Sequence, residues 1–407
     1  MAIREDIIKF IRSGESSEQN LGLEIEHFVV NEKGLMIGFD EVTGLISKVA
    51  EDLQAKKIFM DGYTVGYVVS GYSVTLEPAC QFEISIDPKS DIGEIESIYR
   101  DFLSLWEPIF AESGYSIINK GNLPLVESGE LDPDDIPLSP KKRYKYMDAY
   151  FRKSGKYGKY MMRASSSVQV SVDYRSESDL VRKLRVLQKI SPILMIAMES
   201  KSDEESVLEK GSDKKHLFRI QEWDDLDPAR TGFYPESFDP DFGYGKIADV
   251  ILHTPLILLT DEGETSDVGN KNAADLLEQK LVKEEELVKE RENRLIEHFI
   301  SMGFFHFRVK KYIEIRVADS VPIEKALGYV ALIKGLVYSD NNLTALEERL
   351  SHITSSEMIQ EAVEEIKIHG FNAVIYGDHT AKEWYKYISE LASTELSEKE
   401  QEYLQYV

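Results

Sequence analysis

Four stretches of the chain alternate apolar and polar residues with the period of a β-strand. They cover residues 21–30, 74–86, 162–174 and 310–317. Successive side chains of a strand point to opposite faces of its sheet, so each stretch would present an apolar row on one side and a polar row on the other. If the four strands share one sheet, one face of that sheet belongs to the core. The other face would carry acidic, amide and arginine side chains.

The polar rows suit the binding of a divalent metal and phosphate. Carboxylates that share a face repel each other unless a proton or a cation lies between them. Hard oxygen ligands suit Mg²⁺ or Mn²⁺, particularly where phosphate oxygens complete the shell, and the donor fork of arginine suits carboxylate or phosphate. The members of the four rows are Glu24, Glu26, Glu77, Gln81, Glu83, Arg163, Gln169, Asp173, Glu314 and Arg316.

The acidic rows also have a plain structural interpretation. Glu24 and Glu26 alone would form an ordinary solvent-facing strand, and it is the second acidic strand that favours a site. Pro78, between Glu77 and Gln81, indicates a bulge or a sheet edge, where acids can face water. Both interpretations of the second strand therefore stay open.

The arginines leave two interpretations open as well. Arg316 could form a structural ion pair with Glu314, two positions before it, as readily as it could bind phosphate. Arg230 lies in a loop bounded by glycine and proline, residues 227–236. There it could reach a substrate carboxylate or remain an ordinary surface residue.

The spacing of apolar residues predicts helices for much of the remaining chain. These helices cover residues 2–14, 42–55, 91–113 and 176–199, and the stretch from Val321 onward is almost wholly helical. Residues 57–78 are predicted as strands joined by glycine turns, and residues 131–147 as a loop punctuated by prolines. Residues 259–303 are predicted as a charged helix preceded by a loop. The last could cover a site as a lid, although an inert surface helix is the plainer interpretation.

The polar strands decide the domain organisation. They run from residue 21 to residue 317, so the sheet cannot be divided between domains without destroying the polar face. We therefore expect one catalytic domain over 1–407, with a sheet-bearing part (1–320) and a mostly helical part (321–407). The expected class is α+β, with helices packed on the back of an antiparallel or mixed sheet.

Composition excludes several classes of partner. The 407 residues carry a formal net charge of −25, which argues against nucleic acid or an anionic membrane surface as a partner. The single cysteine, Cys80, excludes an intramolecular disulfide and fits a reducing cytoplasm. No stretch approaches the roughly eighteen apolar residues of a membrane span, and the first residues lack an apolar secretion signal. We expect a soluble cytoplasmic protein.

Familiar nucleotide and nucleophile motifs do not occur. The sequence has neither a Walker loop nor a G-x-G-x-x-G after a strand, so a P-loop or Rossmann site is not indicated. No G-x-S-x-G elbow accompanies the serines of 162–174. His27 falls on the apolar face of its strand and is predicted to be a hydrogen-bonded core histidine.

Six motifs in sequence order resemble the glutamate–cysteine ligase family, in the branch shared by plants and many bacteria. They lie within roughly residues 20–320: LGLEIEHF, SVTLEPACQFEIS, DIPLSPKKRYKYMDAYF, MMRASSSVQVSVDYRSESDLVRKLR, DPARTGFYP and KKYIEIRVAD. The resemblance implies a glutamine-synthetase-like fold. Its cupped antiparallel sheet would form the active site, with helices on the back of the sheet and around the rim.

The resemblance also implies an activity and roles for individual residues. The family joins the γ-carboxylate of L-glutamate to the amine of L-cysteine through γ-glutamyl phosphate, using ATP and two or more Mg²⁺ ions, with Mn²⁺ as an alternative; this is the first step of glutathione-type thiol biosynthesis. Arg316 would face the transferring phosphoryl group, and with Lys310 it would bind the nucleotide. Arg163 and Arg230 would contact anionic substrate groups, Arg163 also as a catalytic residue, and Gln81 would bind substrate. The implied metal ligands are Glu24, Glu26, Glu77, Glu83, Gln169 and Glu314.

Three departures from the family pattern leave the acceptor amine open. Cys80 stands where the family usually has glycine, and residues 198–217 and 259–303 diverge. A related carboxylate–amine ligase that uses another amine is therefore an alternative. A second alternative is a non-catalytic relative that binds metal or nucleotide, but the complete set of acidic residues and Arg316 argue against it. A third alternative is a phosphotransferase that makes only an acyl phosphate. We expect a monomer or a weak homodimer.

Overall fold

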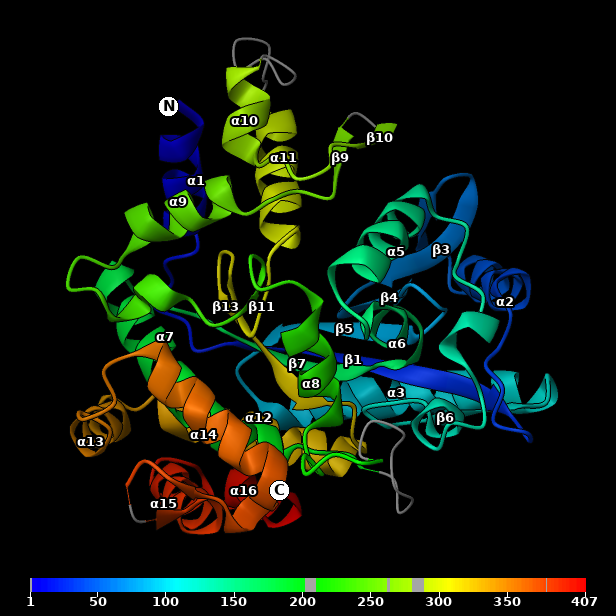
Figure 1. Ribbon diagram of the computed structural model, residues 1–407. Helices are drawn as coiled ribbons and strands as arrows, with labels where there is room; N and C mark the ends of the chain where they lie inside the picture. Colours follow the sequence, from blue (N-terminus) through cyan, green and yellow to red (C-terminus); the bar gives the residue numbers. More distant parts are fainter. Residues whose placement is uncertain (1, 202–209, 262–263, 280–288, 378) are drawn as a thin grey trace.

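The computed structural model describes residues 2–201, 210–261, 264–279, 289–377 and 379–407 (Figure 1). In this part of the chain the central element is a nine-stranded sheet in which every neighbouring pair is antiparallel. Its strands, in order across the sheet, are β12 (Phe307–Val309), β13 (Ile313–Asp319), β7 (Ser167–Val172), β1 (Leu21–Asn31), β5 (Phe82–Lys89), β4 (Tyr72–Leu76), β3 (Tyr63–Val69) and β2 (Lys56–Met60), with β6 (Tyr115–Ile118) paired to β1.

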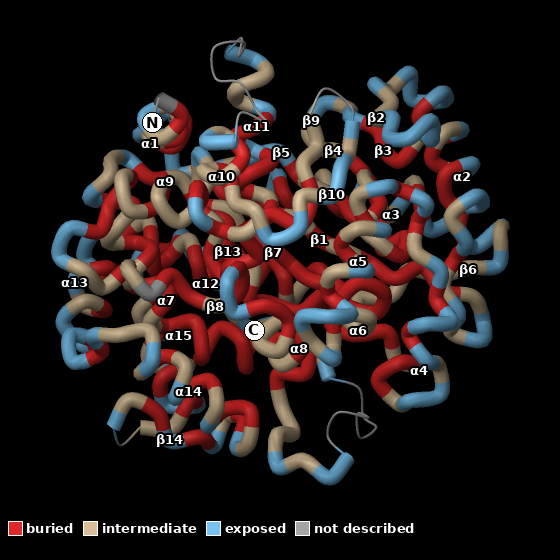
Figure 2. The backbone as a smooth tube through the Cα atoms, turned by 45° about the horizontal axis from the view of Figure 1, so that its top comes forward, coloured by how far each residue is buried: buried red, intermediate tan, exposed pale blue. Residues whose placement is uncertain are grey.

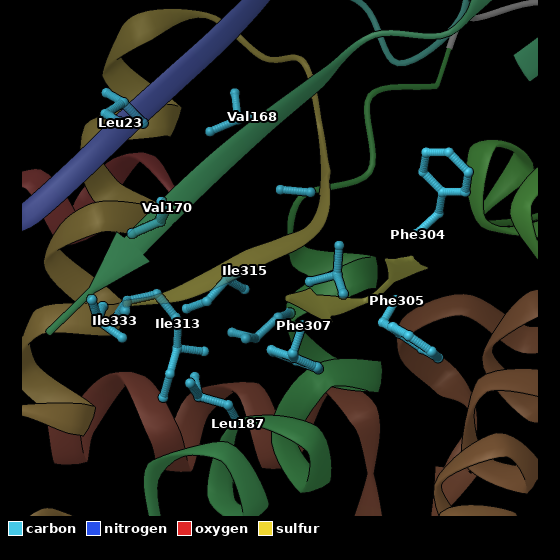
Figure 3. Close-up of a cluster of buried hydrophobic side chains, with 14 of the residues drawn as sticks. Leu23, Val168, Val170, Leu187, Phe304, Phe305, Phe307, Ile313, Ile315 and Ile333 are labelled. Atoms are coloured by element: carbon cyan, nitrogen blue, oxygen red, sulfur yellow. The ribbon is translucent and has the colours of Figure 1, made fainter. Parts of the chain in front are cut away.

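One face of the sheet is apolar because the strand pattern is in register across the central strands. Ile25 of β1 lies opposite Ile84 of β5 and Val168 of β7, and all three side chains are fully buried. Such cross-strand apolar pairs stabilise a sheet. Figure 3 shows side chains of this face, such as Val170 and Ile315, together with Leu187 and Ile333 of the covering helices.

Three long helices cover the apolar face: α3 (Ile92–Glu112), α7 (Glu177–Ala197) and α12 (Ile323–Val337). The first begins at Asp91, whose side chain accepts a hydrogen bond from Gly93 N. The second begins at Ser176, whose side chain accepts one from Asp179 N. Both are N-caps that satisfy amide groups left free at a helix start.

The other helices surround this core (Figures 1 and 2). They are α1 (Ala2–Arg12), α2 (Phe39–Asp52), α4 (Pro124–Glu127), α5 (Lys142–Ser154), α6 (Gly158–Ala164), α8 (Phe218–Leu226), α9 (Tyr244–His253), α10 (Ala273–Glu278), α11 (Lys289–Ser301), α13 (Asp340–Arg349), α14 (Ser356–His369), α15 (Ala381–Ser393) and α16 (Glu398–Gln401). Short strands pair outside the main sheet: β8 (Thr231–Gly232) with β11 (Phe304–Phe305), β9 (Leu258–Asp261) with β10 (Glu264–Asp267), and β14 (Val374–Ile375) with β15 (His379–Thr380).

The predicted α+β class with an antiparallel sheet is confirmed. The same cluster of buried apolar residues contains strand residues such as Ile315 and C-terminal residues such as Leu332 and Ile388. The C-terminal helices therefore share the core of the sheet. No helix among the described residues is long and apolar enough to cross a bilayer.

His27 is the core histidine that the strand pattern predicts. Its side chain is fully buried, with Nδ1 2.7 Å from Phe82 O and Nε2 2.7 Å from the Tyr99 hydroxyl. Burial lowers its pKa to about 4, so the ring is neutral at pH 7.

Two predicted strands are shorter in the structure. Residues 74–86 form the hairpin of β4 and β5, because Glu77 N donates to Gln81 O at 2.9 Å and Cys80 N to Glu77 O at 3.0 Å. In the third stretch α6 continues to Ala164, so the strand begins only at Ser167. Alternation alone did not reveal these local turns.

Two loop predictions are also corrected. The predicted loop 131–147 is too long, because α5 already begins at Lys142. The segment 259–303 begins with the β9–β10 hairpin and continues into α10 and α11. Residues 280–288, part of the predicted charged helix, lie outside the described residues, as do 202–209 of the divergent segment 198–217.

Cys80 occupies a backbone conformation that L-residues avoid. Its φ is +69° in the turn between β4 and β5, and its side chain is buried. Left-handed backbone costs a non-glycine residue roughly 1–2 kcal/mol. Glycine has no such penalty.

We expect Cys80→Gly to change the free energy of unfolding by less than about 1 kcal/mol, because relieved strain offsets the lost burial of a small side chain. Cys80→Val should lower it by about 2 kcal/mol or more, since a β-branched side chain fits this conformation poorly. Urea unfolding of both variants measures the difference. An equal loss of unfolding free energy in the two variants would contradict the proposed backbone strain at Cys80.

Candidate active site

A cavity of about 380 Å³ lies over the polar face of the sheet. Most of its lining comes from strands β1, β4, β5, β7, β12 and β13 and from α5, α6 and α8, which lie beside these strands in Figure 1. Residues of β2, β3, β11 and α11 complete it. The charged and amide residues that line it are Glu24, Glu26, Glu77, Gln81, Glu83, Lys141, Arg143, Gln169, Arg219, Arg308 and Arg316.

Sheet register brings the acids together. Glu26 of β1 lies directly opposite Glu83 of β5, and Glu24 lies opposite Gln169 of β7. Directly opposed side chains in a sheet have Cβ atoms about 5 Å apart. Glu77, at the end of β4, faces the same cavity. The four predicted acidic positions of the first two strands therefore form one cluster, which we call the carboxylate cluster.

Burial and mutual repulsion favour the protonated forms within the carboxylate cluster. Burial raises the pKa of Glu26 to about 7, and the charge of Glu77 adds to this effect. Burial also raises the pKa of Glu24 above its usual value and that of Glu83 well above it, again with neighbouring carboxylates contributing. A cation bound among these groups would reverse the preference, because it favours ionised carboxylates.

Hydrogen bonds fix the orientation of the cluster. Ser167 N donates to Glu26 Oε2 at 2.8 Å, and Thr75 Oγ1 donates to Glu83 Oε1 at 2.7 Å. Gln169 Nε2 donates to Glu26 Oε1 at 3.3 Å, while its Oε1 accepts from Arg316. The amide thus connects the acids of β1 to an arginine of β13.

Glu314 is the centre of a cationic group beside the cluster. It is fully buried and accepts from Arg308 at 2.6 Å, from Lys310 at 2.6 Å and from Arg316 at 3.0 Å. Although burial opposes ionisation, these three cations hold the pKa of Glu314 well below its usual range. The ion pair with Arg316 that the sequence left open is therefore present. Lys310 and Glu314 are absent from the cavity lining, whereas Arg308 and Arg316 belong to it.

A β-bulge sets the position of Arg316. Ile315 pairs with Val170 and Ala318 with Val168, so β13 has one extra residue against β7 between these pairs. Bulges re-aim side chains next to active sites. Arg316 lies in this bulge and lines the cavity.

The structure does not bring Arg163 and Arg230 into the cavity. Arg163 binds the carboxylate of Asp148 and donates to Ile136 O at 3.1 Å. Arg230 is fully buried and donates from Nε to Asp227 at 2.7 Å and from Nη1 to Pro255 O at 2.7 Å. Both guanidinium groups connect segments of the fold, and the predicted contact with substrate stays a prediction.

Gln81 lines the cavity, but its amide is already used within the fold. Its Oε1 accepts from Ala79 N at 2.8 Å, and its Nε2 donates to Ser165 O at 3.0 Å. The side chain therefore stabilises the β4–β5 turn. Each of these bonds uses only one of the two protons or lone pairs of the amide, so the predicted substrate contact stays a prediction.

Sequence reasoning missed the cavity residues that come from helices. Arg143 and Tyr144 of α5 and Arg219 and Trp223 of α8 all line the cavity. Arg219 and Trp223 are four positions apart, a spacing that places two side chains on one helix face. That spacing was visible in the sequence. Nothing there showed which structure the face would meet.

The donor set suits a hard cation. Among the described residues no group of three or more acidic, histidine or cysteine side chains forms a ready-made metal centre. Mg²⁺ usually takes only one or two carboxylates from a protein and completes its octahedron with water and substrate phosphates. The carboxylate cluster fits that mode of binding.

Comparison with solved structures shows the class of fold. The glutamate–cysteine ligase of Francisella tularensis, solved in complex with AMP, superposes with a TM-score of 0.53 at 13% identity, over 96% of this chain and 81% of that one. The protein thus has the fold of a glutamate–cysteine ligase.

Sequence comparison shows the family. The chloroplastic glutamate–cysteine ligase B of Oryza sativa subsp. japonica is 27% identical over 361 residues, which is 87% of this chain and 70% of that protein. The chloroplastic glutamate–cysteine ligase of Arabidopsis thaliana is 28% identical over 87% of this chain and 66% of its own length. The chain belongs to glutamate-cysteine ligase family 2, whose profile matches residues 20–402.

The raised pKa of Glu26 predicts a loss of stability with rising pH in the metal-free protein. Its folded-state pKa of about 7 lies above the ordinary 4.5, so the folded protein binds more protons between these values. The free energy of unfolding should therefore fall as pH rises through this window, by up to about 3 kcal/mol.

Urea unfolding in EDTA at pH 5 and pH 8 measures this dependence. Glu26→Gln should gain stability relative to the wild type between the two pH values, because the amide has no proton to lose. A difference between the proteins that does not change with pH would contradict the assignment.

Proposed function

We propose that the chain is an ATP- and Mg²⁺-dependent glutamate–cysteine ligase, which forms γ-glutamylcysteine through γ-glutamyl phosphate. One observation carries this proposal. In a chain of this family, a cavity brings the carboxylate cluster of the sheet against arginines of β12, β13, α5 and α8. A site with both signs of charge suits a metal–nucleotide and an amino acid together.

The proposed chemistry matches the residue types. A carboxylate is a poor acyl donor, so the γ-carboxylate of glutamate must first receive the terminal phosphoryl group of ATP. The amine of cysteine then attacks the acyl phosphate, and inorganic phosphate leaves. Phosphoryl transfer depends on positioning and on charge stabilisation rather than on a covalent nucleophile. The fixed charges around the cavity would supply both.

The carboxylate cluster would hold the metal. We assign this role to Glu24, Glu26, Glu77 and Glu83, with the Gln169 carbonyl as a neutral ligand once it is released from Arg316. Bound Mg²⁺ would neutralise phosphate charge and orient the phosphoryl group for in-line transfer. The raised pKa values of Glu24, Glu26 and Glu83 support a site completed by a cation.

We assign Glu314 a different role from the predicted one. Its two oxygens already accept hydrogen bonds from three cations. It would therefore anchor Arg308, Lys310 and Arg316 rather than bind metal. Arg316, held on one side by Glu314 and on the other by Gln169, would face the transferring phosphoryl group.

Arg143 would bind an anionic group of a substrate. It lines the cavity, and its hydrogen bond in the described part of the chain is a long one of 3.5 Å to Ser301 Oγ. Burial lowers its pKa. A half-buried guanidinium that has no ion pair with a carboxylate among the described residues gains from an anion that enters the site.

Three further properties belong to the same proposal. The shared apolar core supports one catalytic domain over residues 1–407. We propose a monomer or a weak homodimer in the cytoplasm, and light scattering of the purified protein would measure the oligomeric state. The nature of the acceptor amine is the least constrained property, because it depends on segments that diverge from the family pattern.

The product assay tests the activity directly. Purified protein with ATP, Mg²⁺ and L-glutamate should form γ-glutamylcysteine only when L-cysteine is added, with one phosphate released per dipeptide. Mass spectrometry measures the dipeptide and a colorimetric assay the phosphate. Turnover with another amine instead of cysteine would show that the acceptor substrate is that amine. If the folded protein shows no turnover with any amine, the assignment of ligase activity is refuted.

Arg316→Lys should lower kcat about tenfold or more, because lysine cannot provide the two-donor fork that arginine offers to phosphate. Arg185→Lys is the matched control. Arg185 is also partly buried and donates to the backbone carbonyls of Ser237 and Asp239. Steady-state kinetics of the two variants separates the roles, and equal rates would favour a purely structural ion pair for Arg316.

A further inference from the structure

A second cavity adjoins the one over the sheet. Its volume is about 660 Å³, and it lies between the turn of β2 and β3, the β9–β10 hairpin and α11 (Figure 2). Met60, Arg143 and Ser301 line both cavities, so the two spaces meet at these residues. The carboxylate cluster lines the first cavity and not the second. A ligand at the junction can therefore place one part beside the cluster and another part away from it.

Arg143 carries positive charge at this junction. It is half-buried, and its hydrogen bond to Ser301 Oγ is a long one of 3.5 Å. Burial lowers the pKa of Arg143, and Tyr144 and Glu77 of the first cavity act against this effect. Burial also lowers the pKa of His298 of the second cavity to about 4, and the charge of Arg143 adds to that effect. An anionic group bound to Arg143 would therefore lie where the cavities meet.

The charged side chains of the second cavity suit an amino acid better than a nucleotide. Asp61, Asp261 and Glu297 line it, and their carboxylates would repel a triphosphate. Arg294 lines it too, but it is paired at 2.8 Å with a glutamate of the same helix. An α-amino acid has no net charge from its backbone groups at pH 7. Its carboxylate needs one cation, which Arg143 provides.

Apolar side chains line the second cavity beside the junction. They are Phe59, Met60 and Leu295, and Thr260 and Thr265 of the β9–β10 hairpin add methyl groups. Phe59 is 66% exposed and Met60 39% exposed, so apolar surface is left open at the cavity. Covering such surface with an apolar ligand group is favourable. The part of a ligand that enters this cavity should therefore be apolar.

The second cavity is larger than a cysteine side chain requires. Pockets that hold a whole small-molecule ligand have volumes of about 300–1,000 Å³, and this cavity falls within that range at about 660 Å³. The side chain of cysteine has one carbon and one sulfur atom and would leave most of the space unfilled. A bulkier apolar side chain would reach the walls.

We propose that the second cavity holds the side chain of the acceptor amino acid and admits apolar side chains larger than that of cysteine. This inference rests on the proposed function. The α-carboxylate of the acceptor binds Arg143, and its amine points into the first cavity. There the nitrogen forms a bond to the γ-carboxyl carbon of glutamate, and the bond from that carbon to the phosphate oxygen breaks. Phosphate leaves with the electron pair, and the extra proton of the amine passes to water.

A comparison of acceptors tests the size of the site. With ATP, Mg²⁺ and L-glutamate, the protein should join L-methionine and L-phenylalanine with kcat/KM within about tenfold of the value for L-cysteine. Thr265→Trp fills the second cavity from β10 and should raise the KM for these two acceptors about tenfold or more, with the KM for ATP unchanged. Mass spectrometry measures the dipeptides.

Ser266→Trp is the matched control. Ser266 is the exposed neighbour of Thr265 on β10, and its side chain points to the opposite face of the strand. This variant should keep the wild-type KM for every acceptor. Dipeptide formation with L-cysteine alone would overturn the proposal, as would equal kinetics in the two tryptophan variants.

Cysteamine, which is cysteine without its carboxylate, tests the contact with Arg143. The wild type should use it with a kcat/KM about tenfold or more below that for L-cysteine, because a charged hydrogen bond is lost. Arg143→Gln should lose this preference, with the KM for glutamate changed less than about threefold, and Arg143→Lys should restore part of it. A preference retained in Arg143→Gln, or an effect confined to the KM for glutamate, would overturn the assignment of Arg143 to the acceptor.

A binding measurement separates this proposal from the ligase assignment. Titration calorimetry with L-methionine, in the presence of Mg²⁺–ATP and without glutamate, requires no turnover. Thr265→Trp should bind L-methionine about tenfold more weakly than the wild type and Ser266→Trp. If no amine gives a dipeptide but this difference is found, the ligase assignment fails and the amino-acid site stands. If the wild type neither joins nor binds L-methionine, the proposal is overturned.

Discussion

Partly buried or buried carboxylates on one face of the central sheet repel one another, and the rest of the structure accommodates that repulsion. Glu26 and Glu83 are directly opposed across β1 and β5, and Glu24 and Glu77 face the same cavity. Burial of like charges at this spacing is unfavourable, and it raises the pKa of three of the four groups. The arrangement is stable only because the opposite face of the same strands packs a large apolar core.

The cations are distributed so that they oppose the cluster without neutralising it. Arg308, Lys310 and Arg316 form ion pairs with Glu314 of β13, a strand that β7 separates from β1. Arg143 and Arg219 reach the cavity from α5 and α8. The acids come from the sheet, whereas Arg143 and Arg219 come from helices beside it, and the space between them can hold a ligand with charges of both signs. This division suits a reaction in which a metal–nucleotide and an amino acid meet.

The arginines that line the cavity and those that do not differ in their surroundings and not in their own chemistry. Arg163 and Arg230 are buried, like Arg219 of the cavity, and each has an aspartate partner and a backbone acceptor in the fold. Nη1 of Arg219 has no hydrogen-bond partner among the described residues and lies 3.8 Å from Asp319 Oδ1. A buried charged group whose hydrogen bonds are all satisfied within the protein stabilises one conformation. A buried charged group that lacks a hydrogen-bond partner favours the ligand-bound state, in which the ligand supplies that partner.

The sequence by itself determined the faces of the strands. The alternation of Glu24 and Glu26 with Leu23 and Ile25, and the core position of His27, follow from the two-residue period of a strand. Tertiary structure decided which elements meet: that α5 and α8 bring Arg143 and Arg219 to the cavity, that Arg163 and Arg230 turn away, and that a hairpin at Cys80 and a bulge at Arg316 aim the side chains. A periodic pattern specifies the two sides of one element. Which side meets which other element depends on packing between residues hundreds of positions apart, and no local pattern encodes it.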